Sequence, residues 1–234
     1  LFLEYIPEDI NFAHLTRLEA LRLADDNAFL ESALATLPPT LCSLELEAHF
    51  SDLSDACSAS LPRGLTNLKI YGSESLSDEF VKHLPPNLET LELTNNLRIS
   101  DEGCAMLPKR LANLSIGRNS LISDEAIKIL PRTLRRLVVD AAPLTGACFP
   151  YLPRQLRLFF TSSAKKIFKE SLIHLPRSIV MLDLGTCGNL EDLSCLADFP
   201  PGLVFCVCGA MTSKWRSANQ KEQLDKQLRL LTSS

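Results

Sequence analysis

The stretch LPPNLETLELTNNLRISDE, residues 84–102, contains three signals in a fixed order: a Leu-Pro step, an alternating Leu-x-Leu segment and a Ser-Asp-Glu triplet. Side chains two residues apart in a strand point to the same face, so Leu91 and Leu93 share one face. Ser100 is a helix N-cap residue by type, and the two acidic residues after it favour the positive end of a short helix. The stretch therefore predicts a strand, a bend and the start of a helix.

The same order recurs along the chain. Leu-Pro steps follow one another after 22 to 24 residues, and apolar residues lie four, seven and nine positions beyond each step. Such a period is typical of a solenoid, because one unit cannot bury its own apolar face and gains a core only by stacking on its neighbours. The steps begin at Leu37, Leu61, Leu84, Leu107, Leu130, Leu152 and Leu175, and Phe199 takes the eighth position.

The convex helices are expected to end at the Leu-Pro steps. The residue before a proline is pushed out of helical geometry, and the proline ring has no N–H to donate. Ser77 and Ser123 repeat the N-cap position of Ser100. Residues 78–83 and 124–129 are therefore predicted to be short helices.

The period and the Leu-x-x-Leu-x-Leu core resemble the leucine-rich repeat family over nearly the whole chain. The resemblance implies an α/β fold: a right-handed solenoid, or horseshoe, with a parallel concave sheet and short convex helices. It also implies that Asn96, Asn119 and Cys187 bond to backbone groups left unpaired at the bend after the strand. Residues 1–212 are expected to form about nine repeats, and residues 213–234 a capping helix or a tail.

The first repeat is expected to be truncated. Ile6-Pro7-Glu8-Asp9 lies where a later repeat has Leu76-Ser77-Asp78-Glu79. Residues 1–14 are therefore interpreted as the tail of an earlier repeat whose strand is missing, and the chain as a fragment of a longer protein.

Two branches of the family resemble parts of this pattern. NNLRISDEGCAML (95–107) and LGTCGNLEDLSCL (184–196) are similar to the cysteine-containing repeats of F-box ubiquitin ligases, which are longer and lack the Leu-Pro step. The Leu-Pro-x-x-Leu-x-x-Leu element is similar to the repeats of bacterial effector ubiquitin ligases, which lack the Ser-Asp-Glu helix. Two functions follow. One is a non-enzymatic protein–protein interaction module, such as the substrate-recognition arm of an F-box-type adaptor; the other is the repeat arm of an enzyme whose catalytic domain is absent from the chain.

The eight cysteines favour a reducing environment. In an extracellular chain they could form four disulfides. However, Cys206 and Cys208 take the inward positions of the last strand and Cys104 lies in a predicted helix, so they are interpreted as buried thiols that pack like small apolar residues. The expected location is intracellular, either cytoplasmic or nuclear.

No metal, cofactor or catalytic residue is predicted. Cys187, Cys195, Cys206 and Cys208 lie close together in the sequence, but they lack the paired short spacing of zinc ligands. The sequence contains no Gly-x-Ser-x-Gly, His-Glu-x-x-His or phosphate-binding glycine loop, so it is not expected to be an enzyme. It also has no run of eighteen apolar residues, and a membrane span is not predicted.

Charge is distributed unevenly. Residues 1–103 contain 6 Lys or Arg and 18 Asp or Glu, whereas residues 128–177 contain 10 and 2. Arginines between the Leu-Pro step and the strand should align along one edge of the solenoid, where their fields add. This edge is interpreted as a docking site for an acidic protein segment or as a solvated rim; nucleic acid is disfavoured because few aromatic residues are interleaved. The edge comprises Arg132, Arg135, Arg136, Arg154, Arg157 and Arg177.

The concave sheet is the second predicted binding surface. The residue between the two strand leucines faces outward, and repeat proteins commonly bind ligands on this face. In the first four repeats these residues alternate in charge, as neighbouring pairs of opposite sign. The predicted partner-binding residues are Arg22, Glu45, Lys69, Glu92, Ser115, Val138 and Asp183.

One repeat departs from the pattern. Residues 141–168 contain two extra prolines and lack Ser-Asp-Glu. Their strand fits two phases, with either Phe159 and Thr161 or Leu158 and Phe160 inward, and a shift of one residue exchanges the two faces. The irregularity is either functional or a tolerated loss of the pattern.

Overall fold

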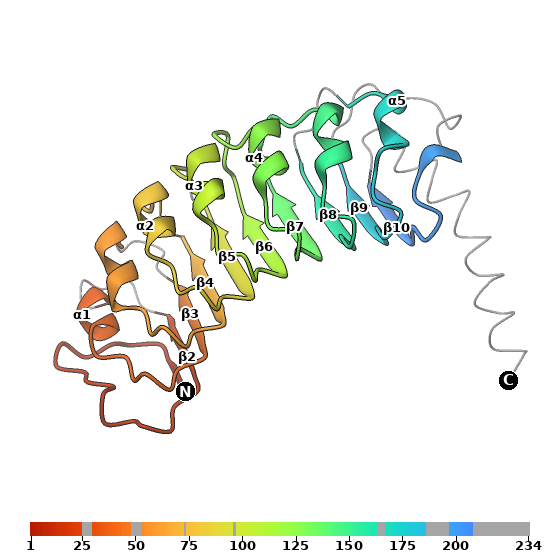
Figure 1. Ribbon diagram of the computed structural model, residues 1–234. Coiled ribbons are helices and arrows are strands. Elements are labelled where there is room, and N and C mark those ends of the chain that lie inside the picture. The colour runs from red at the N-terminus through yellow and green to blue at the C-terminus, as the bar shows by residue number, and fades with distance from the viewer. Residues whose placement is uncertain are drawn as a thin grey trace, which may run out of the picture.

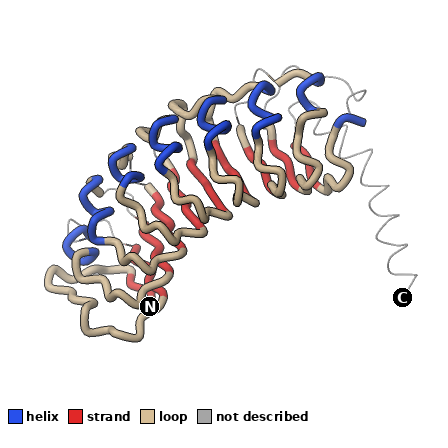
Figure 2. Tube along the Cα trace, viewed as in Figure 1, coloured by secondary structure: helices blue, strands red, loops and turns tan. Residues whose placement is uncertain are grey.

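The computed structural model describes residues 1–24, 30–47, 53–72, 74–95, 97–162, 167–185 and 197–207. Ten parallel strands form one sheet in which spatial order equals sequence order. The chain forms an arc with the strands on the inner side and the helices on the outer side (Figures 1 and 2). This arrangement confirms the predicted α/β solenoid.

The elements are short, as expected for repeats of this length. The strands are Phe2–Leu3 (β1), Ala20–Ala24 (β2), Ser43–Glu47 (β3), Asn67–Tyr71 (β4), Thr90–Thr94 (β5), Asn113–Ile116 (β6), Arg136–Val139 (β7), Leu158–Phe160 (β8), Met181–Asp183 (β9) and Phe205–Val207 (β10). The helices are Leu30–Leu34 (α1), Asp78–Lys82 (α2), Asp101–Met106 (α3), Asp124–Ile129 (α4) and Lys169–Leu172 (α5), and two 3-10 helices are Asp55–Ser60 (η1) and Gly146–Tyr151 (η2).

The core consists of rows of equivalent apolar side chains. Leu68, Leu91, Leu114 and Leu137 are direct partners on β4 to β7, and each is fully buried. Burying a leucine side chain contributes about 1.5–3 kcal/mol. The stacking of such rows makes neighbouring repeats depend on one another.

The predicted helix caps are present. The side chains of Ser77, Ser100 and Ser123 each accept a hydrogen bond from the backbone N–H two residues on, at 3.3, 3.1 and 3.1 Å. Helix α4 has the predicted bounds, and α2 is one residue shorter than expected. These caps satisfy backbone donors that would otherwise lack a partner at the first turn.

The aspartate after each cap residue bonds to the next repeat. Its carboxylate accepts from the backbone N–H of the next cap residue at 2.7–2.8 Å and from that residue's hydroxyl at 2.5–2.6 Å. We call these paired bonds the Asp staples. They join Asp55 to Ser77, Asp78 to Ser100, Asp101 to Ser123 and Asp124 to Thr145.

The Asp staples end after Thr145. Gly146 stands in the aspartate position of η2, and Phe168, which makes no side-chain cap bond, replaces the serine before α5. A Cβ on Gly146 would overlap the Oγ and Cβ of Ser171. In this repeat, Ser171 therefore fills the space that the aspartate uses elsewhere.

The predicted role of the bend asparagine is confirmed at Asn119. This side chain is fully buried, donates from Nδ2 to the Ile99 carbonyl at 2.5 Å and accepts at Oδ1 from the Leu121 N–H at 2.9 Å. Asn96 and Cys187, for which the same role was expected, lie outside the described residues.

Two expectations about the strands are settled by the register. The strand of the first repeat is not missing, because β1 pairs with β2 through Phe2 and Arg22. In β8 the phase with Phe159 and Thr161 inward holds, since both are buried and Phe160 is only half-buried. The predicted capping helix or tail lies beyond the last described residue.

Candidate protein-binding surface

The predicted concave residues form one continuous row. Arg22, Glu45, Lys69 and Glu92 are successive partners on β2 to β5, and the row continues through Ser115 and Val138 to Phe160 and Asp183. Most of these side chains are partly exposed, but Ser115 is only 7% exposed. The structure thus brings the seven predicted residues onto one surface and adds Phe160, which the ambiguous phase of its strand had left out.

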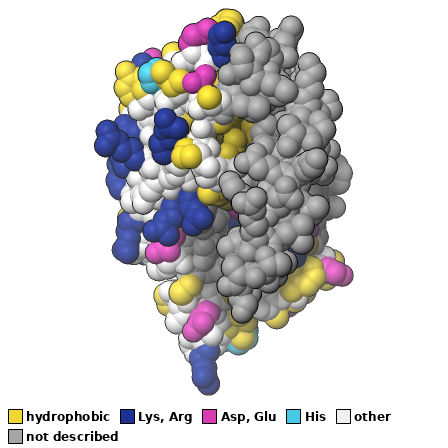
Figure 3. All heavy atoms as spheres, turned by 90° about the vertical axis from the view of Figure 1, so that its right-hand side faces the viewer, with side chains coloured by type: hydrophobic (Ala, Val, Ile, Leu, Met, Phe, Trp, Pro, Cys, Tyr) yellow, Lys and Arg dark blue, Asp and Glu magenta, His cyan; other side chains and the backbone are white. Residues whose placement is uncertain are grey.

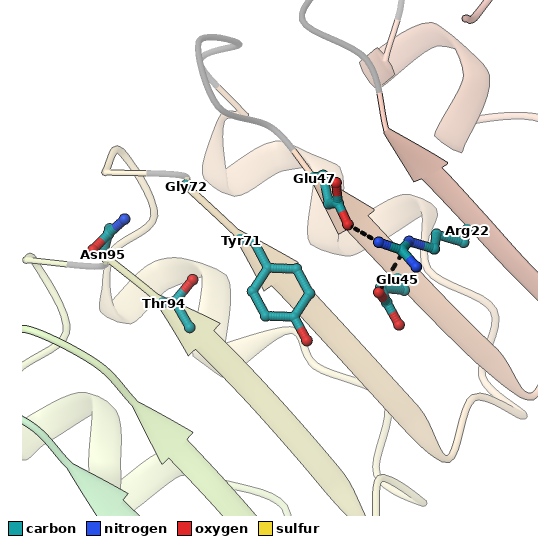
Figure 4. A pocket seen from close by; sticks show the side chains of 7 residues that line it. All are labelled: Arg22, Glu45, Glu47, Tyr71, Gly72, Thr94 and Asn95. Carbon is teal, nitrogen blue, oxygen red and sulfur yellow. Dashed lines mark hydrogen bonds and ion pairs between the residues drawn. The ribbon is translucent and has the colours of Figure 1, made fainter. Parts of the chain in front are cut away.

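Ion pairs organise the first half of this row. Arg22 pairs with Glu45 at 3.1 Å and with Glu47, and its guanidinium lies 5.0 Å from the ring centre of Phe2. The hydrogen bond that the Arg22 guanidinium donates to Glu47 is the main cause that raises the pKa of Arg22. Figure 4 shows both glutamates turned toward the guanidinium. This cation is therefore already neutralised within the chain.

Glu92 is the centre of a second network. Its carboxylate lies 2.9 Å from Arg136 and 3.9 Å from Lys69, and it accepts a 3.4 Å hydrogen bond from the Tyr71 hydroxyl. Burial, followed by the charge of Glu92, raises the pKa of Tyr71. The network reaches from β4 to β7, across four strands of the sheet, and fixes the directions of its side chains.

A hollow of about 410 Å³ opens at the end of this charged half. Asn95 has a positive φ of 57° and Gly72 one of 87°, so the chain turns sharply at both positions. Most of the lining side chains are polar or charged, so they can form hydrogen bonds. The lining residues are Arg22, Glu45, Glu47, Tyr71, Gly72, Thr94 and Asn95 (Figure 4).

The second half of the concave face is apolar. Over β7 to β10 the outward positions carry only aliphatic, aromatic or Met side chains, apart from Arg136 and Asp183, and all are half-buried. We call this surface the apolar patch. It consists of Val138, Leu158, Phe160, Met181, Phe205 and Val207. Only Val138 belonged to the predicted site.

The predicted basic edge is present with one correction. Arg132, Arg135, Arg154, Arg157 and Arg177 are exposed in the loops that precede β7, β8 and β9, and we keep the term basic edge for these five. Figure 3 shows Lys and Arg side chains gathered on one side of the solenoid. Arg136, in contrast, is the first residue of β7 and lies on the sheet in contact with Glu92.

The arginines of the basic edge lack acidic partners in the part of the chain that the structure describes. Arg132 donates to the backbone carbonyls of Lys128, at 3.0 Å, and Tyr151. The Arg157 N–H donates to the Arg135 carbonyl at 2.8 Å, so these two residues occupy equivalent positions in adjacent turns. Two positive charges therefore belong to adjacent turns with no acidic partner among the described residues.

Comparisons with known proteins agree with this geometry. No protein-family model and no curated protein matches the sequence. An internalin, InlF of Listeria monocytogenes, is similar in structure, with 22% identity, a TM-score of 0.63 and coverage of 83% of this chain and 55% of that one. A chain of the yeast Rad7–Elc1 complex matches with 19% identity, a TM-score of 0.55 and coverage of 84% and 52%.

The fold is that of a leucine-rich repeat solenoid. The chain spans about half the length of the two solved chains that it matches. At these identities the likeness concerns the fold, and the solenoid's binding properties must be argued from its own side chains.

Four of the five described cysteines fit the predicted interior role, and Cys42 does not. Cys57, Cys104 and Cys148 are buried free thiols, Cys42 is an exposed one, and Cys206 is buried at the inward position of β10. Burial raises the pKa of Cys57 and Cys104 to about 12 and also raises that of Cys148. Such thiols are neutral at physiological pH and poor nucleophiles.

The described ranges contain no metal-binding cluster and no membrane-spanning helix. There, no three His, Cys, Asp or Glu side chains converge as a metal site. Cys187, Cys195 and Cys208, on which the zinc alternative rested, lie outside those ranges. None of the described helices is long and apolar enough to cross a membrane.

Proposed function

We propose that the solenoid is a non-enzymatic protein-interaction module that binds a protein partner on its concave face. The observation that carries this proposal is the division of that face into a paired, charged half and an apolar half. Helices cover only the outer side of the sheet, and the described residues form no layer over the inner side (Figure 2).

The two halves have different roles in this proposal. The apolar patch provides affinity when the partner removes its side chains from water, because buried apolar and aromatic groups dominate interface energies. The networks around Arg22 and Glu92 are already paired, so they discriminate between partners more than they add affinity.

The finer assignment is the substrate-recognition arm of an F-box-type ubiquitin ligase adaptor. It is supported by the similarity of residues 95–107 to cysteine-containing repeats, and an intracellular location, cytoplasmic or nuclear, accompanies it. The structural likeness to a chain of the Rad7–Elc1 complex places the same fold in a protein assembly. The alternative is the repeat arm of an effector-type ubiquitin ligase, supported by the Leu-Pro-x-x-Leu-x-x-Leu element.

The coding sequence upstream of Leu1 distinguishes these assignments. An F-box there supports the adaptor, whereas a ubiquitin-ligase catalytic domain supports the enzyme arm. If neither is encoded in the complete transcript, both finer assignments are wrong and the interaction module alone remains.

Binding by the concave face is tested by substitution. Phe160→Ser removes an aromatic side chain from the apolar patch, and Ile129→Ser removes an exposed aliphatic side chain, 44% accessible, from the convex helix α4. Cross-linked partners of the full-length protein are compared by mass spectrometry. We expect Phe160→Ser to lose partners that Ile129→Ser retains. Retention of every partner by a folded Phe160→Ser variant would contradict the proposal.

A further inference from the structure

We propose that the apolar patch and the basic edge form one surface that binds an acidic amphipathic helix of the partner protein, lying along the solenoid axis over β7 to β9. This inference rests on the proposed function and specifies the chemistry of the partner. It joins two surfaces that were predicted separately, and each contributes a distinct observation.

The first observation is the lack of neutralisation at the basic edge. Elsewhere on the sheet the described cations Arg22, Lys69 and Arg136 contact a glutamate. At the basic edge, Arg135 and Arg157 stack in adjacent turns with no carboxylate near them among the described residues. Like charges on neighbouring strands are destabilising. Such a stack attracts a polyanionic partner and becomes favourable when the partner binds.

The second observation is that the two surfaces are continuous. Arg157 immediately precedes Leu158, the first outward residue of β8, and Arg135 immediately precedes β7. A segment that covers Leu158 and Met181 therefore passes beside the backbone positions that carry the exposed Arg135 and Arg157. Arg136, paired with Glu92, stands in the same row as Leu158 and Met181 and marks the end of the apolar patch at β7.

The spacing of the repeats favours a helical ligand. Neighbouring parallel strands are about 4.8 Å apart, and an α-helix rises about 5.4 Å per turn. Side chains at positions i, i+4 and i+7 of a helix therefore advance nearly in step with successive turns of the solenoid. Side chains on one face of an extended strand are about 6.7 Å apart and lose this register. A glutamate stripe beside a leucine stripe matches the basic edge and the apolar patch together.

Nucleic acid is a less suitable ligand for the combined surface of the apolar patch and the basic edge. Single-stranded nucleic acids bind basic surfaces on which aromatic rings stack with the bases. The Tyr151 ring already faces Lys128 at 5.4 Å, and the rings of Phe160 and Phe205 are half-buried in the apolar patch. A protein segment carrying carboxylates is therefore the ligand that we infer.

The test uses fluorescence anisotropy with synthetic labelled peptides and the full chain. The probe is an amphipathic helix with a glutamate stripe beside a leucine stripe, and the control peptide has the same composition in scrambled order. The variant Arg135→Glu/Arg157→Glu reverses the charge of the basic edge. Its matched control, Arg17→Glu/Arg63→Glu, reverses two exposed arginines of the first repeats. Circular dichroism verifies that both variants fold.

We expect the Kd of the striped helix to rise about tenfold or more in Arg135→Glu/Arg157→Glu and to stay unchanged in the control variant. Phe160→Ser should also weaken this peptide. Equal binding of the striped and scrambled peptides, or no effect of the reversed charges, would overturn the acidic-helix inference. Binding of labelled single-stranded RNA but not of the peptide would assign the edge to nucleic acid instead.

These outcomes separate the inference from the proposed function. If Phe160→Ser loses cellular partners while Arg135→Glu/Arg157→Glu keeps them, the concave face is the binding surface and the acidic-helix inference is wrong. If both variants keep every partner, the inference and the proposed function fail together.

Discussion

The convex side of the solenoid is built differently in residues 54–145 and in residues 146–183. The first region has Asp staples from each helix to the next. The described residues of the second region form none, and its repeats meet through apolar contacts such as the edge-to-face pair of Phe149 and Phe159, whose ring centres are 6.1 Å apart. The loops before the strands are alike in both, since Thr133 and Ser178 each bond to two carbonyls of the preceding repeat.

The repeats that the staples hold together are therefore not the repeats that carry most of the proposed binding surface. In a solenoid, stability is approximately a sum over repeats and nearest-neighbour interfaces, so loss of a polar tie weakens one interface locally. The second region lacks staples and carries most of the apolar patch and the basic edge. Binding surfaces are commonly drawn from the less stable parts of a fold. A ligand over β7 to β9 would tie together the repeats that the staples leave free.

The largest expected effect comes from removing one staple. Asp101→Ala deletes two hydrogen bonds to a carboxylate, each worth about 1.5 kcal/mol, so the free energy of unfolding should fall by about 3 kcal/mol. Chemical denaturation measures it. Asp140→Ala is the control, because the Asp140 side chain makes no hydrogen bond or ion pair in the described chain. Equal losses in the two variants would show that the staples add nothing specific.

A smaller effect is expected at the site where the staples stop. Gly146→Ala places a Cβ where Ser171 lies, and overpacking of this kind costs about 1–3 kcal/mol. The same substitution in a Ser171→Gly background should cost much less. A double-mutant cycle in thermal unfolding measures this coupling. Additive losses would mean that Ser171 does not fill the vacated aspartate position.

Thiol labelling compares the two regions directly. Cys104 lies in α3, which is stapled on both sides, whereas Cys148 lies in η2, which is stapled on one side only. Both thiols have raised pKa values, so they react only after local opening. If the free energy of local opening is about 1.4 kcal/mol lower around Cys148 than around Cys104, Cys148 should be labelled roughly tenfold faster. Peptide-resolved mass spectrometry measures the two labelling rates. Equal rates would remove the proposed difference in stability.

The smallest effect is expected inside the second region. The Thr161 hydroxyl is buried and has no hydrogen-bond partner among the described residues. Thr161→Val should therefore raise the free energy of unfolding by about 1 kcal/mol. In Thr133→Val the hydroxyl bonds to the carbonyls of Lys109 and Leu111 are lost, so this control should be destabilised. Urea denaturation of the two variants should give opposite signs.

The period of the sequence was sufficient to predict the fold. Stacking forces equivalent residues into rows, so the spacing of Leu91, Leu93 and their counterparts sets strand order and register together. The caps at Ser77, Ser100 and Ser123 followed from residue type. The hydrogen bonds from the aspartates to the next repeat were not predicted, because the aspartates were expected only to interact with the helix dipole. The regular spacing between each aspartate and the next cap residue could have predicted these bonds.

Parts of the binding surface were less predictable. Arg136 was placed on the edge because only the residue between two inward leucines was counted as concave. In an alternating strand the residue before the first leucine also faces outward, and this row contains Arg136, Leu158 and Met181. The phase of β8 was ambiguous because apolar residues occupy both of its faces, and only packing against Leu137 and Leu182 selected Phe159.

The Asp staples also make the solenoid modular in length. Each staple connects neighbouring helices only, so excision of residues 78–100 would leave Ser77 bonded to Asp55 and place Asp101 directly after it, still facing Ser123. Strands β4 and β6 would then become neighbours with compatible leucine rows. Whole repeats can thus be gained or lost while every remaining Asp staple keeps its partner. A shorter or longer solenoid would then have a correspondingly shorter or longer concave binding face.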